Sequence, residues 1–173
     1  SNINNFYEED FNILNPRKND RGTGDGINRM EFPLMQWLFA GCYKIFGNNL
    51  LVSRMLSFLL SLLSLLGMYK LIRRLFKDHF LALTGVFCMS LSPAFFYYAV
   101  CPIPDNLALA TGIWGLYHAV NWQLNKQNVS LFTSAILLSV SALCKLPFVL
   151  YFVFPATVIL LNLYKRKDYK TFI

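Results

Sequence analysis

The stretch from Leu50 to Leu71, LLVSRMLSFLLSLLSLLGMYKL, constrains the fold more than any other part of the chain. About 22 residues in a helix reach roughly 33 Å, enough to cross the ~30 Å hydrocarbon core of a bilayer. Hydrophobic residues make up 55% of the 173 residues and charged residues only 14%, whereas about a quarter of the residues in soluble domains are charged. The pattern predicts an integral membrane protein with several helical spans.

A change from polar to apolar composition near residue 33 divides the chain into two parts. Residues 1–33 are polar, charged and dotted with glycine, and they are predicted to form an extracytoplasmic loop with a short surface helix. Residues 34–173 are predicted to form the membrane part. The expected fold class is all-α, a polytopic transmembrane helical bundle with an interfacial amphipathic helix and a short extracytoplasmic loop segment. We expect the interfacial helix over residues 33–46 and spans over residues 50–71, 80–100, 106–124, 130–144 and 148–164.

The chain has a net charge of +7, and the positions of its basic residues indicate how it crosses the membrane. Basic residues gather at 70–77, at Lys126 and at 165–170, in polar stretches that alternate spans would place on one side of the membrane. By the positive-inside rule this side is cytoplasmic, which puts residues 1–33 and the turn over residues 101–106 outside. A basic nucleic-acid-binding face is therefore not expected, and no nucleic acid is predicted as a partner.

The remaining sequence signals concern targeting and cysteine chemistry. The four cysteines are scattered in or beside apolar blocks without a CxxC pair, so buried free thiols are expected. The chain starts with the polar run SNINN, lacks an apolar signal region, and ends abruptly at Ile173. These features lead to the expectation that the sequence is a fragment of a longer protein.

Three ionisable residues are predicted to converge on the extracytoplasmic side. Glu31 lies at the seam between the polar segment and the apolar blocks, Asp105 follows Pro104 in a turn, and Lys145 ends a short apolar helix. Each also has a purely structural interpretation. The two acids would be stabilised near helix N-termini, and the lysine could extend to the lipid headgroups. Together they would suit a phosphate-bearing lipid, with the lysine on the phosphate and the acids on a metal ion or an acceptor.

The order and spacing of several short motifs resemble the polyprenyl-phosphate-sugar-dependent glycosyltransferases of the GT-C superfamily. The branch that they resemble contains the protein O-mannosyltransferases and the lipid A aminoarabinose transferase. The resemblance covers nearly the whole chain. The motifs are Asn5-Phe6-Tyr7-Glu8, Asn15-Pro16, Met30-Glu31-Phe32-Pro33-Leu34, Tyr43-Lys44-Ile45-Phe46-Gly47, Ser53-Arg54-Met55-Leu56, Ser92-Pro93, Pro104-Asp105 and Cys144-Lys145-Leu146-Pro147.

The resemblance implies a membrane enzyme that moves a sugar from a polyprenyl-phosphate donor to an acceptor lipid, glycan or protein on the extracytoplasmic face. It implies catalytic roles for Glu31 and Asp105, a divalent metal ion at Glu31, and donor-phosphate binding by Lys145. It further implies location in a bacterial inner membrane. The family's principal catalytic aspartate and its C-terminal half are expected to lie outside this sequence, so the chain alone is expected to be inactive.

A secondary transporter or flippase fragment is the alternative. Broken helices and charges inside the membrane are typical of such proteins. Transporters place these charges near the midplane and often contain internal repeats, whereas here the charges gather at one face and no repeat is seen. The sequence identifies neither the sugar nor the acceptor.

Overall fold

The computed structural model describes residues 2–8, 11–14, 32–158 and 160–161. Every regular element in this part of the chain is helical, which confirms the all-α prediction. The elements are α1 (Asn2–Glu8), α2 (Leu34–Phe46), α3 (Leu50–Phe76), α4 (His79–Ser90), α5 (Pro93–Tyr98), α6 (Pro104–Asn125), α7 (Asn128–Cys144) and the 3-10 helix η1 (Leu146–Phe152).

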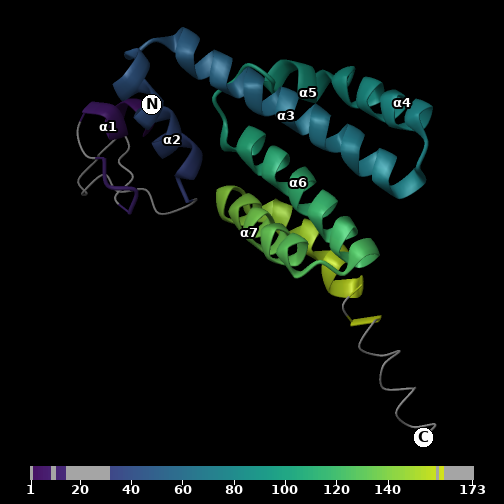
Figure 1. Ribbon diagram of the computed structural model, residues 1–173. Coiled ribbons are helices and arrows are strands. Elements are labelled where there is room, and N and C mark those ends of the chain that lie inside the picture. The colour runs from purple at the N-terminus through teal and green to yellow at the C-terminus, as the bar shows by residue number, and fades with distance from the viewer. Residues whose placement is uncertain (1, 9–10, 15–31, 159, 162–173) are drawn as a thin grey trace, which may run out of the picture.

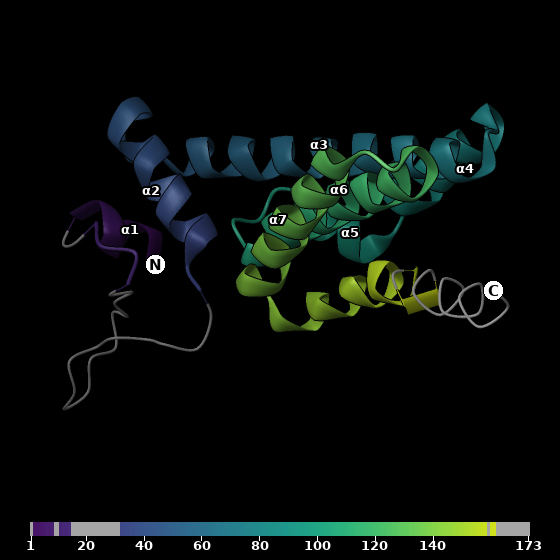
Figure 2. The ribbon, with the colours of Figure 1, turned by 60° about the horizontal axis from the view of Figure 1, so that its bottom comes forward.

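Helix α6 lies at the centre, with α3 packed on one side and α7 on the other (Figure 1). Helix α4 returns beside α3, and η1 packs against α7. At one end of this assembly α1 packs on α2, and Figure 2 shows α2 running across the end of α3 instead of along it. The interfacial position expected for residues 33–46 stays a prediction.

Helix α2 buries a different set of side chains from the one that its sequence suggested. In the sequence, Gln36, Tyr43 and Lys44 fall at i, i+7 and i+8, which puts them on one face of the helix, and a tyrosine there suits the headgroup level. Instead Tyr43 is 4% exposed and packs edge-to-face against Tyr7 of α1, while Lys44 is exposed. The physical reason is that α1 covers this face of α2, and an apolar ring gains more from that contact than from the surface.

Helix α3 buries small side chains and exposes large apolar ones, which is the reverse of the pattern in a soluble protein. Its buried residues are all small, namely Ser53, Ser57, Ser61, Ser64 and Gly67. Many of its large apolar residues, among them Leu59 and Leu66, are exposed. Small residues at helix interfaces and large apolar residues on the outside are typical of helices packed within a bilayer.

Helix α6 uses the same kind of interface toward α7. Buried Ala108, Gly112, Gly115 and Ala119 recur every three or four residues along it. Two serines of α7 reach across this close contact: Ser141 Oγ donates to the Ala108 carbonyl at 2.6 Å and Ser134 Oγ donates to the Gly115 carbonyl at 2.8 Å. These bonds and small residues hold α6 and α7 in close register.

Among the described residues, one helix, α3, is long and apolar enough to cross a membrane by length and composition. It extends past the predicted end at Leu71 because lysine and arginine are good helix formers and no helix breaker occurs before Lys77. The apolar helices α4 and α7 and the segment Leu146–Val158 are shorter. The number of spans therefore stays a prediction.

Two of the predicted spans also differ in form from a continuous helix. Residues 80–100 are split into α4 and α5 at Leu91-Ser92, since Pro93 begins a new helix. The start of the last predicted span is the 3-10 helix η1, which contains Pro147 and follows the extended backbone of Lys145. Both breaks lie beside the candidate site and shape its walls.

Candidate functional site

Asp105 is held at the N-terminal end of α6. Pro104 is the first residue of this helix, and the fixed proline φ angle suits that position. Asp105 in the first turn is stabilised by the positive end of the helix dipole. Its side chain is 43% exposed, so the carboxylate is accessible from outside the protein.

Lys145 approaches the same place from the C-terminal end of α7. Its backbone is extended, with φ −154° and ψ 114°, and its N–H donates to the Ser141 carbonyl at 3.1 Å. This turn directs the side chain toward α6, where Nζ lies 3.6 Å from Asp105 Oδ2. The structure thus confirms that Asp105 and Lys145, 40 positions apart in the sequence, come together.

Glu31, the third residue predicted here, lies outside the described residues. The described chain resumes at Phe32, immediately before α2. Within the described part of the chain, no group of three histidine, cysteine or acidic side chains is placed to hold a metal ion. The roles of Glu31 in catalysis and in metal binding therefore remain predictions.

The Asp105–Lys145 pair lines a pocket of about 520 Å³. The polar part of its lining is Asp105, Lys145 and Asn106, while Phe95 and Phe148 contribute aromatic walls. A phosphate bound at the lysine could leave an attached hydrocarbon chain against these rings. A lysine ammonium has three donors, and Asp105 Oδ2 at 3.6 Å is one partner of this group.

Asn106, which no sequence motif singled out, organises this pocket. It is 7% exposed, and its Nδ2 donates to the carbonyl of Tyr98 at 2.9 Å and to that of Cys101 at 2.8 Å. These two bonds tie the end of α5 and the following turn to the start of α6. An asparagine directly after Pro-Asp at a helix start was the only available sequence signal, and it does not reveal which carbonyls the side chain meets.

Residues 31–173 match the sequence profile of the dolichyl-phosphate-mannose-protein mannosyltransferases. The chain belongs to this family. Comparison with curated proteins and with solved structures finds no match. Members of this mannosyltransferase family are membrane glycosyltransferases that use a polyprenyl-phosphate sugar donor. The profile match confirms the family resemblance that the sequence motifs indicated. Glu31, Asp105 and Lys145 all fall inside the matched region.

In this mannosyltransferase-family chain, Asn106→Ala is expected to lower the free energy of unfolding by about 1–3 kcal/mol, since two part-buried hydrogen bonds to carbonyls are lost. Thermal unfolding in detergent measures the loss. Asn128→Ala, at an exposed position at the start of α7, is the matched control and should change stability by less than about 0.5 kcal/mol. Equal losses in the two variants would contradict the organising role of Asn106.

Proposed function

We propose that the pocket at Asp105 and Lys145 binds the phosphate of a polyprenyl-phosphate-linked sugar in a GT-C-type glycosyltransferase. The enzyme transfers the sugar to an acceptor on the extracytoplasmic face of a bacterial inner membrane. The observation that carries this proposal is the ion pair at 3.6 Å on the wall of a pocket with aromatic sides. The Lys145 ammonium offers positive charge to a phosphate, and the rings offer apolar surface to the start of a prenyl chain.

The proposed reaction is a displacement at the anomeric carbon of the donor sugar. An acceptor hydroxyl oxygen forms the new bond to that carbon while the bond to the phosphate oxygen breaks. The lipid phosphate leaves with one additional negative charge, which the Lys145 ammonium stabilises. The acceptor proton passes to a carboxylate, for which Glu31 and Asp105 are the candidates. No step of this sequence is assigned to a metal ion.

The distribution of charge supports an extracytoplasmic site. At the end of α6 opposite Asp105, the Arg74 guanidinium of α3 donates to Asn125 Oδ1 at 2.8 Å. Lys70, Arg73 and Lys77 lie on α3 and at its end, close to this contact in sequence. The positive-inside rule assigns that end to the cytoplasm, which leaves Asp105 and Lys145 on the other side.

Substitution of the two acids tests the proposed catalytic roles. In the protein expressed from its natural gene, Asp105→Asn and Glu31→Gln are each expected to reduce sugar transfer at least about 100-fold, because a base or an orienting carboxylate is lost. The assay follows a radiolabelled sugar from its polyprenyl phosphate in isolated membranes. Membrane insertion should be unchanged in both variants. Normal turnover in both would remove these residues from the mechanism.

A further inference from the structure

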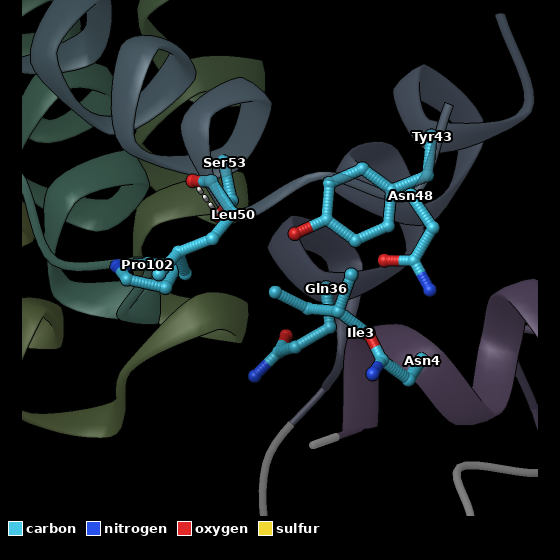
Figure 3. A pocket seen from close by; sticks show the side chains of 8 residues that line it. All are labelled: Ile3, Asn4, Gln36, Tyr43, Asn48, Leu50, Ser53 and Pro102. Atoms are coloured by element: carbon cyan, nitrogen blue, oxygen red, sulfur yellow. Dashed lines mark hydrogen bonds between the residues drawn. The ribbon is translucent and has the colours of Figure 1, made fainter. Parts of the chain in front are cut away.

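A second pocket, of about 380 Å³, lies where α1, α2 and the start of α3 meet (Figure 3). Its polar lining consists of Asn4, Gln36, Tyr43, Asn48 and Ser53. None of the described residues that line it carries a charge. Figure 3 shows the Tyr43 hydroxyl pointing away from its own helix into the space bounded by these side chains.

Gln36 is the residue in this pocket that indicates a ligand. Its Oε1 atom is buried, and in the described part of the chain it has no hydrogen-bond partner. A buried acceptor without a partner is costly, so such groups in native proteins usually meet a bound molecule or serve a function. Because this atom has almost no accessible surface, the amide must turn toward the pocket before a ligand hydroxyl can donate to Gln36 Oε1.

The chemistry of the lining selects for a ligand with many neutral hydroxyl groups. Side-chain amides donate and accept, and the tyrosine hydroxyl does both, so together they match the mixed donors and acceptors of a sugar ring. Ile3, Leu50 and Pro102 supply apolar surface for the carbon-bound face of such a ring. A phosphate or carboxylate would find no cation among these lining residues.

The pocket is placed beside the candidate donor site. Pro102 lines this pocket, whereas Ile103 and Asp105 line the pocket that contains Lys145. One short turn between α5 and α6 therefore separates an uncharged polar pocket from a charged one. This arrangement would bring an acceptor hydroxyl and a donor phosphate to opposite sides of the same turn.

We infer that the pocket at Gln36 and Tyr43 binds an uncharged glycoside, and that this glycoside is the sugar acceptor. The binding site follows from the pocket itself, and only its role as acceptor site rests on the proposed function. The acceptor class is then a neutral glycan, with a hydroxyl presented toward the turn over residues 101–106.

The test measures binding of methyl α-mannoside to the detergent-solubilised full chain by saturation-transfer NMR. Gln36→Met keeps the length of the side chain and removes its amide, so the dissociation constant should rise about tenfold. Gln123→Met makes the same chemical change on α6, at a residue that does not line the pocket, and should leave the constant unchanged. Lys145→Met should also leave it unchanged. Thermal unfolding of each variant establishes that it is folded.

Two results would overturn the inference. One is that the wild-type chain fails to bind the glycoside. The other is that Lys145→Met weakens binding while Gln36→Met does not, which would place the sugar in the charged pocket. A tenfold loss in Gln36→Met, together with no sugar transfer from polyprenyl-phosphate donors by the protein expressed from its natural gene, would support the binding site and refute the glycosyl-transfer function. The two failures are therefore distinguishable.

Discussion

Lys145→Met is expected to reduce sugar transfer by about 10²–10³-fold in the protein expressed from its natural gene. Methionine has nearly the same length but carries no charge, so the leaving phosphate loses the cation that stabilises it. Folding should be little affected. The Lys145 and Asp105 side chains are 31% and 43% exposed, and partly exposed ion pairs contribute only about 0–1 kcal/mol. The measurement is sugar transfer in membranes, with thermal unfolding of the same sample.

Lys126→Met is the matched control for this prediction. Lys126 is exposed at the far end of α6, where its Nζ donates to Gln123 Oε1 at 3.0 Å. The same change of charge there should leave transfer within about twofold of the wild type. Lys145→Arg should retain part of the activity because it keeps a cation near the phosphate. Equal losses in Lys145→Met and Lys126→Met would show that net charge matters and that the pocket does not.

Gly115→Val is expected to have the largest effect on stability, lowering the free energy of unfolding by about 2–3 kcal/mol. A Cβ atom at Gly115 would lie 2.7 Å from Leu138 Cγ and 3.2 Å from the Leu138 backbone nitrogen. Leu138 is 1% exposed and has no room to move, so α6 and α7 must separate. Separation would also break the bond from Ser134 Oγ to the Gly115 carbonyl. Thermal or denaturant unfolding in detergent measures the loss.

A helical glycine in an open environment is the comparison for Gly115. At Gly41 of α2 an added Cβ would lie 3.7 Å from Phe11 Cζ, which is ordinary van der Waals contact. Gly41→Ala should therefore be neutral or stabilise the helix by up to about 1 kcal/mol. If Gly115→Val unfolded no more easily than Gly41→Ala, this result would contradict the close contact between α6 and α7 at Gly115.

Patterns that depend on local chemistry were predictable from the sequence. Apolar blocks located α3 and α7, and Pro104 marked the start of α6. The meeting of Asp105 and Lys145 followed from placing both at the same ends of neighbouring spans, and the structure brings their side chains together. Glu31 remains a prediction because it lies outside the described residues.

Features that depend on tertiary packing were not predictable in the same way. The serines at positions 53, 57, 61 and 64 recur at helical spacing, which is a readable sign of a helix interface, but only the structure shows that all four are buried. The burial of Tyr43 depends on α1 covering α2, and the bonds of Asn106 depend on the path of the turn before it. Neither contact leaves a periodic signal in the sequence.

Photocrosslinking tests the central claim most directly, namely that the pocket at Asp105 and Lys145 holds the donor phosphate. The probe is a polyprenyl phosphate with a photoreactive group on its first prenyl unit, added to membranes that contain the protein. The account predicts adducts on Tyr98 or Phe148, which line this pocket, and their loss in Lys145→Met. Adducts confined to the opposite end, near Arg74 and Asn125, or adducts that persist unchanged in Lys145→Met, would contradict it.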